Sequence, residues 1–227
     1  MTTPEQAPQL VLDLGHRPAL AREDFLVAPC NETAVSWLDR WPAWPSPLLV
    51  LVGGPGSGKS HLASVWQAQS GASRLSAANL VAGDPWKWLR PTPACIVEDA
   101  PVGLDEQALL HLANAAAESE GHLLITSTAP PSRWGVRLPD LASRMRAAQM
   151  AMLDDPDDNL LAAVMVKLFT DRQVAVTPEV IAYVVPRMER SFAAARALVA
   201  ALDKAAMAER RAVTVPLARK VLAGRQM

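Results

Sequence analysis

The sequence has few of the residues that mark extracellular proteins or proteins that coat nucleic acid. Its 227 residues include only two cysteines, Cys30 and Cys95. Two cysteines far apart in unlike contexts predict free, reduced thiols rather than a disulfide framework. The formal net charge is −1, so the strong basic excess of a nucleic-acid-coating protein is missing, although a local basic patch stays open.

Long apolar runs are also absent. No stretch approaches the roughly 18 apolar residues that a membrane-spanning helix needs. The N-terminal stretch MTTPEQAPQLVLDLG has neither the basic start nor the long apolar centre of a signal peptide. These absences predict a cytoplasmic protein with no membrane partner. Apolar residues nevertheless make up 50% of the chain, enough for the core of an α/β domain with a small appendage.

Short apolar runs alternate with helical patterns between residues 48 and 153. Continuous apolar runs separated by helices predict an α/β fold with a parallel β-sheet that helices cover on both faces. The expected strands are 48–52, 73–77, 94–98, 122–126 and 148–153. The expected helices are about 59–70, 79–90, 105–119 and 139–146, with one more at about 31–40.

The pattern changes at the DDPDD stretch, residues 154–158. Beyond it the sequence predicts helices only, at about 157–171, 178–187, 191–209 and 214–223. We therefore expect an N-terminal tail at 1–20, an α/β nucleotide-binding domain at 21–154, and a small all-helical lid domain at 155–227.

A glycine-rich loop follows the first expected strand. Gly53, Gly58, Lys59 and Ser60 match G-x-x-x-x-G-K-[ST], with a strand before the loop and a helix after it. Successive backbone N–H groups of such a loop surround phosphate oxygens, the lysine reaches the β and γ phosphates, and the serine binds Mg²⁺. The predicted nucleotide contacts are Gly53, Gly54, Pro55, Gly56, Ser57, Gly58, Lys59 and Ser60.

Two acidic residues end the third expected strand, in "ACIVEDAP". The usual order is a magnesium-organising Asp followed by a catalytic Glu, whereas Glu98 here precedes Asp99. We expect Glu98 to hold a metal-bound water and Asp99 to be too short for an efficient base. The next strand ends in Thr126, Ser127 and Thr128, and Thr128 is the candidate sensor of the γ-phosphate. The sequence thus predicts nucleotide binding more firmly than hydrolysis.

Several segments in order resemble the AAA+ domain of DnaA, the bacterial replication initiator. They are "REDFLVAPCNETAV" (22–35), "GGPGSGKSHL" (53–62), "TSTAPPS" (126–132), "DLASRM" (140–145) and "RALVAALD" (196–203), and the resemblance extends over about 22–223. Thr128 stands where that family has an Asp.

The resemblance implies roles for further residues. Arg144 would be an arginine finger supplied in trans, with Arg146 as the neighbouring alternative, and Arg196 would be the second sensor. The nucleotide would also lie beside His61 and beside Leu26 and Val27. A homo-oligomer formed through AAA+ interfaces remains open.

The ends of the chain differ from DnaA. No DNA-binding domain follows the expected lid, so we expect no direct sequence-specific DNA binding. Near the start, "QLVLDL" resembles the peptide that docks on the DNA polymerase III β sliding clamp, with Gln9 in a polar niche and Leu10, Leu12 and Leu14 in an apolar groove. An edge strand added to the protein's own sheet is the alternative.

Together these features are similar to the Hda-type regulators, which stimulate hydrolysis of DnaA-bound ATP and so reduce replication initiation. The resemblance implies ADP or ATP as the cofactor, with ADP favoured, together with Mg²⁺, and DnaA and the clamp as partners. The alternatives are an autonomous ATPase such as a helicase loader of the DnaC type, and a DNA-binding accessory protein that the net charge of −1 disfavours.

Overall fold

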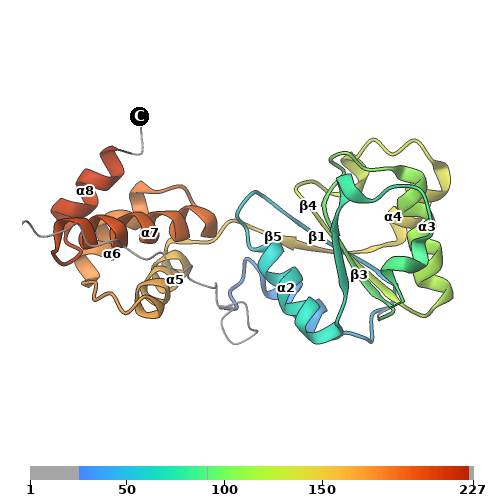
Figure 1. The fold of residues 1–227 in the computed structure, drawn as a ribbon, viewed down its shortest axis with the longest axis horizontal. Coiled ribbons are helices and arrows are strands. Elements are labelled where there is room, and N and C mark those ends of the chain that lie inside the picture. The colour runs from blue at the N-terminus through green and yellow to red at the C-terminus, as the bar shows by residue number, and fades with distance from the viewer. Residues whose placement is uncertain (1–25, 91, 225–227) are drawn as a thin grey trace, which may run out of the picture.

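The computed structural model describes residues 26–90 and 92–224 as a parallel α/β part and a helical part that lie along the long axis of the molecule (Figure 1). The helices and strands of the α/β part are α1 (Glu32–Asp39), β1 (Leu48–Gly53), α2 (Lys59–Ser70), β2 (Ser73–Ser76), β3 (Ala94–Ala100), α3 (Glu106–Glu118), β4 (His122–Ser127), α4 (Pro139–Ala147) and β5 (Gln149–Leu153). Three short 3-10 turns join them: η2 (Ala77–Asn79), η3 (Pro85–Trp88) and η4 (Pro131–Arg133).

The five strands form one sheet in the order β2-β3-β4-β1-β5, and every neighbouring pair is parallel. This confirms the predicted fold class. In a parallel sheet all carboxyl ends meet at one edge, and ligands of open α/β sheets bind beyond that edge. The loop after β1 and the polar ends of β3 and β4 are therefore neighbours.

The central strand β1 shows how both faces of the sheet are covered. All of its residues are buried. Leu49 and Leu51 pack into a cluster with α1 and α2, whereas Leu48, Val50 and Val52 pack into a cluster with α3 and α4. Because successive side chains of a strand point to opposite faces, the continuous apolar run buries one set against each helical layer.

Tryptophans strengthen the layer of α1 and α2. Trp66 of α2 is fully buried, and the Trp44 ring stacks on it at a centroid distance of 5.3 Å. His122, at the start of β4, meets Trp44 edge-on at 5.3 Å. The Nε1 atom of Trp44 donates a hydrogen bond to the carbonyl of Trp37. These tryptophans serve core packing.

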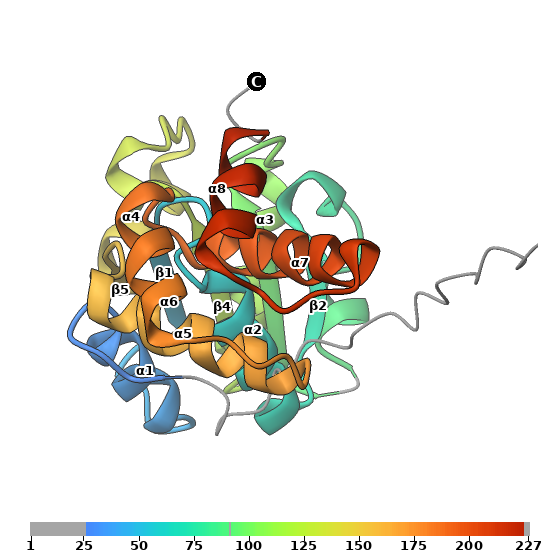
Figure 2. The same ribbon diagram turned by 90° about the vertical axis from the view of Figure 1, so that its left-hand side faces the viewer.

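The helical part has a hydrophobic core of its own, in which Phe169 and Leu202 are fully buried. It begins where Asp157 caps a helix by accepting a hydrogen bond from the backbone N–H of Leu160 at 2.7 Å. Figure 2 shows its helices in front of the α/β part. They are α5 (Asp158–Asp171), α6 (Pro178–Val184), the 3-10 turn η5 (Val185–Arg187), α7 (Phe192–Glu209) and α8 (Val215–Ala223).

One predicted helix, at about 79–90, is wrong. The 3-10 turn η2 ends at Asn79, and the segment contains only one further short 3-10 turn, η3. Asp84 precedes Pro85, and the proline ring keeps the residue before it out of the helical region; Asp84 is extended, with ψ 106°. Its side chain accepts a hydrogen bond from the backbone N–H of Trp86, which starts a new turn at this point.

Candidate functional site

The loop after β1 has the backbone shape of an anion-binding nest. Gly56 and Gly58 have φ values of +74° and +101°, which glycine adopts without the steric penalty of a β-carbon. At Gly53 a β-carbon would lie 2.6 Å from Ser57 Oγ and 2.7 Å from the carbonyl oxygen of Leu153. Within the described part of the chain, no acceptor meets the N–H groups of Gly56 and Gly58. These groups and the start of α2 can receive phosphate oxygens.

Lys59 is held inside this loop. Its Nζ atom donates hydrogen bonds to the carbonyl oxygens of Gly53 and Gly54, both at 2.7 Å, and the residue is only 8% exposed. Burial lowers the pKa of Lys59, and the nearby charge of Asp99 opposes this shift. Both acceptors are neutral carbonyl groups. A negatively charged phosphate would bind the ammonium group of Lys59 more strongly. The contact of Lys59 with the phosphates stays a prediction.

Asp99 lies on a strained bulge at the end of β3. Its φ is +61°, and the pairing of β3 with β4 shifts register between Val97 and Ala100. Its backbone N–H donates a hydrogen bond to Oγ1 of the buried Thr126 at 3.1 Å. Thr126 thus stabilises the bulge. Asp99 is exposed, and its charge acts on Lys59.

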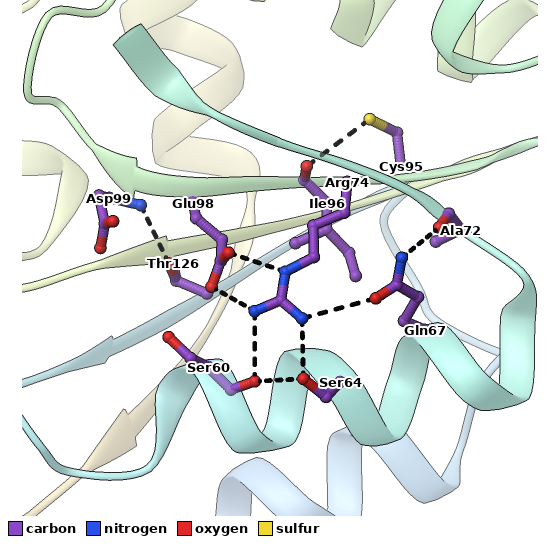
Figure 3. Close-up of polar contacts among 10 residues, drawn as sticks. All are labelled: Ser60, Ser64, Gln67, Ala72, Arg74, Cys95, Ile96, Glu98, Asp99 and Thr126. Atoms are coloured by element: carbon purple, nitrogen blue, oxygen red, sulfur yellow. Dashed lines mark hydrogen bonds and ion pairs between the residues drawn. The ribbon is translucent and has the colours of Figure 1, made fainter. Parts of the chain in front are cut away.

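Glu98 does not lie free for a metal, and this differs from the arrangement expected from the sequence. Its two carboxylate oxygens accept hydrogen bonds from Arg74, from Nε at 2.7 Å and from the terminal NH2 atom at 2.8 Å (Figure 3). Glu98 in this state therefore does not fit the role of a magnesium ligand. Ser60 is exposed and its side chain points away from Arg74, so Ser60 and Asp99 are the oxygen donors that a metal could still reach.

The three hydroxyls that end β4 have different surroundings. Thr126 and Ser127 are buried and hold the backbone in place, because Ser127 bonds to the carbonyl and the N–H of Ala129 and accepts from Trp134 Nε1. Thr128 is exposed and makes no hydrogen bond to another described residue. The side chain chosen as the sensor is thus the one of the three that is available to a ligand.

The segment before α1 connects the two parts of the molecule. Asn31 is 1% exposed, and its side chain bonds to the backbone on both sides, accepting from the N–H of Ala28 at 2.9 Å and donating to the carbonyl of Leu26 at 3.0 Å. Leu26 and Val27 are 36% and 49% exposed, so apolar surface is open at this point. Sequence reasoning named Asn31 only as part of a resembling segment and missed its structural role.

The start of α7 touches the phosphate loop directly. The backbone N–H of Phe192 donates a hydrogen bond to the carbonyl of Gly56 at 3.1 Å. A β-carbon at Gly56 would lie 2.9 Å from that of Ala193. Arg196 follows one helical turn after Phe192 and is exposed, and partial burial lowers its pKa. The helical part can therefore respond to what the loop binds.

Arg144 and Arg146 belong to the last turn of α4, far from this loop. The half-buried Arg144 and the exposed Arg146 have no ion-pair partner among residues 26–90 and 92–224. Helix α4 leads into Gln149, which pairs with Leu49 at the start of β1 rather than with Gly53 at its end. Four residues of strand separate those points by about 13 Å, so the two arginines lie beyond the opposite edge of the sheet.

Some predicted features lie outside the described residues or have no counterpart in them. The predicted clamp peptide, with Gln9, Leu10, Leu12 and Leu14, falls in the first 25 residues and outside the described part. His61 lies half-buried on α2.

In the described ranges no group of three His, Cys, Asp or Glu residues could hold a metal ion. No helix there is long and apolar enough to cross a membrane, and both cysteines are free thiols.

Comparison with known proteins adds to this geometry. Residues 157–222 match the family model described as the lid domain of Hda. The whole fold is similar to domain III of the replication initiation protein DnaA from Thermotoga maritima, with a TM-score of 0.79 and 18% identity, over 92% of this chain and 97% of that one.

Two further solved structures share the fold at lower similarity. AMPPCP-bound DnaA from Aquifex aeolicus has a TM-score of 0.69 and 15% identity, over 82% of this chain and 66% of that one. The Thermotoga maritima RuvB Holliday junction branch migration motor has a TM-score of 0.66 and 15% identity, over 86% of this chain and 66% of that one.

A parallel five-stranded sheet, a phosphate loop after β1 and a helical lid at the carboxyl edge define a P-loop AAA+ domain. The lid, residues 157–222, belongs to the Hda lid family. The fold of the chain as a whole is similar to that of domain III of DnaA.

Proposed function

We propose that this protein is a cytoplasmic regulator that docks on the DNA polymerase III β sliding clamp and stimulates hydrolysis of ATP bound to DnaA, so that replication initiation is reduced. The observation that carries the proposal is the position of Arg144 and Arg146. They lie on α4 beyond the edge of the sheet opposite to the chain's own phosphate loop. An arginine so placed can act only on a nucleotide held by another molecule.

Arginine suits this role because its guanidinium is planar and charged at every physiological pH and can bind phosphate oxygens through two N–H groups. Supplied in trans, such a group stabilises the charge that develops on the transferred phosphoryl and accelerates hydrolysis by about 10³–10⁵ in well-studied cases. We assign the role to Arg144, and Arg146 is the alternative because it is more exposed and lines a pocket of ≈ 280 Å³ between α4 and η4.

The chain's own nucleotide would serve structure more than turnover. Lys59 and the loop amides would bind its phosphates, Thr128 and Arg196 would contact them from β4 and α7, and the base would lie near Leu26 and Val27. The bond between Phe192 and Gly56 supports a coupling between the bound nucleotide and the lid. In the Hda-type regulators that the chain resembles, ADP is the nucleotide of the active form. We therefore expect ADP to fix the position of the lid and so form the surface that DnaA contacts.

The decisive experiment measures hydrolysis of DnaA-bound ATP with this protein present, with and without clamp loaded on DNA. Clamp-dependent acceleration that is lost in Arg144→Ala, and kept in a control variant of the exposed Arg219 on α8, Arg219→Ala, would support the proposal. If Arg146→Ala loses the acceleration instead, the finger is Arg146.

Rapid ATP hydrolysis by this protein alone, with no effect on DnaA, would contradict the proposal. It would favour the autonomous ATPase, a helicase loader of the DnaC type. The structure disfavours that outcome, because Glu98, one of the two carboxylates that such an enzyme would need, is paired with Arg74.

A further inference from the structure

The pairing of β2 with β3 brings Arg74 beside Glu98, the residue expected from the sequence to hold a metal-bound water. Arg74 lies opposite Ile96 in the register, and Ile96 packs into the cluster under α1 and α2. Residues two apart on a strand share a face, so Glu98 lies on the same side as Arg74. Both side chains therefore face α2, the helix that carries Ser60.

Arg74 is held by contacts with Glu98 of β3 on one side and with Ser64 of α2 on the other. Its two-pronged contact with Glu98, at 2.7 and 2.8 Å, uses both carboxylate oxygens. A second terminal nitrogen donates to Ser64 Oγ at 2.7 Å, and Ser64 in turn donates to the carbonyl of Ser60 at 2.8 Å (Figure 3). The two side chains are only 25% and 18% exposed, so solvent weakens the contact less than at the surface.

We propose that Arg74 is a positioning residue that takes the place of a metal ion as the cation beside Glu98, so that this protein holds its nucleotide with little dependence on Mg²⁺. The inference rests on the proposed nucleotide binding and specifies its cofactor requirement. Here the carboxylate expected to organise the metal already has a cation with matched, two-pronged geometry.

The charge of Arg74 and the number of ligands that Mg²⁺ needs explain why the metal should contribute little to nucleotide binding. Mg²⁺ demands near-ideal octahedral coordination and is usually bound through one or two carboxylates in addition to phosphates. To bind Mg²⁺, Glu98 would have to break its contact with Arg74. The half-buried guanidinium would then lose its carboxylate partner. Asp99 remains, but its charge already acts on Lys59. The affinity for nucleotide then comes from Lys59, Arg196 and the loop amides rather than from the metal.

The test uses the full chain and a fluorescent ADP analogue, titrated in excess Mg²⁺ and again in EDTA. For the unaltered protein we expect the two dissociation constants to agree within about threefold. In Arg74→Gln, Glu98 is released for the metal, and we expect the ratio to reach about tenfold, which corresponds to about 1.4 kcal/mol. Arg90→Gln is the matched control, because it breaks the exposed Arg90–Asp84 pair away from the site.

Arg74→Lys provides a second variant if Arg74→Gln does not fold. Lysine keeps the charge but cannot make the two-pronged contact, and we expect a ratio between those of the unaltered protein and Arg74→Gln. A tenfold ratio in the unaltered protein, or equal ratios in the unaltered protein and the Arg74 variants, would overturn the inference while leaving the proposed function intact. Absence of nucleotide binding in both buffers would instead refute the phosphate-loop assignment on which both depend.

Discussion

Asn31 is a single residue that fixes the segment before α1, which is proposed to lie beside the base of the nucleotide. Its side chain is buried and makes two backbone hydrogen bonds, one with Ala28 and one with Leu26. Removing it leaves the part-buried N–H group of Ala28 without this partner, which costs up to about 1–3 kcal/mol. It also frees Leu26 and Val27, whose exposed apolar side chains lie where the base is proposed to bind.

We therefore expect Asn31→Ala to lower the free energy of unfolding by about 1–3 kcal/mol and to weaken ADP binding at the same time. Thermal denaturation and calorimetric titration measure the two effects. Asn159→Ala, at an exposed position on α5, is the control. Unchanged ADP affinity in an Asn31→Ala protein that is destabilised as expected would show that the segment does not contribute to the nucleotide site.

At the same scale, sequence and structure disagree most about the acidic pair. The reversed order of Glu98 and Asp99 could be read from the sequence, and so could the doubt about hydrolysis. The partner of Glu98 could not, because Arg74 is distant in sequence and meets it only through the register of β2 on β3. A charged residue within a short strand candidate was the one available signal.

At the scale of elements, the contact between the phosphate loop and α7 depends on one glycine. Gly56 combines a φ of +74° with a close approach of Ala193 and Ser191. Gly135 has a similar φ of +67°, but a β-carbon added there would have no atom within 4 Å. Comparing the two separates backbone strain, about 1–2 kcal/mol for a residue with a β-carbon, from the clash with α7.

We expect Gly56→Ala to be less stable than Gly135→Ala, and to lose any protection of the lid by ADP against hydrogen exchange. Gly135→Ala should keep that protection. The measurement is amide exchange of α7 with and without ADP. Equal stability and equal protection in both variants would mean that the hydrogen bond between Phe192 and Gly56 does not couple the lid to the loop.

His122, which packs edge-on against Trp44, should make the stability of the fold depend on pH. Burial lowers the pKa of His122 below its ordinary 6.5, against the opposing effect of a backbone hydrogen bond with Pro42. Between the lowered pKa and 6.5 the unfolded chain binds more protons than the folded one, so the folded state loses stability as the pH falls through this range.

We expect the free energy of unfolding to decrease as the pH falls below about 6.5, and to decrease less in His122→Gln, which cannot be protonated. Urea denaturation at a series of pH values measures both slopes. His111→Gln, with an exposed imidazole on α3, is the control and should keep the slope of the unaltered protein. Identical slopes for all three proteins would exclude His122 as the cause.

Most elements could be predicted because their residues follow simple periods. The five strands and the lid helices begin and end close to where the apolar patterns place them. The exception at residues 79–90 has a local cause, the extended Asp84 before Pro85. The positions of Arg144 and the loop relative to each other depend on strand order, which no local pattern contains.

At the scale of the whole molecule, the proposed regulator needs a means to reach DNA-bound clamp. We expect Ala substitution of Gln9 and Leu10 together to abolish retention on immobilised clamp, because a short extended peptide depends on its polar and apolar anchors. We expect ADP affinity and thermal stability to stay unchanged, since Gln9 and Leu10 belong to the clamp peptide and not to the phosphate loop. The readout is a pull-down with purified clamp, and undiminished retention would contradict the docking site.

The segment before α1 also has a consequence for biosynthesis. Ala28 and Cys30 pack against the core of the lid, and the carbonyl of Cys30 accepts a hydrogen bond from the backbone N–H of Asp154. A ribosome releases these two residues long before it has made α5 to α8. The lid therefore completes its core with residues that are made well before its own helices, and it cannot reach its final packing until α8 has been synthesised.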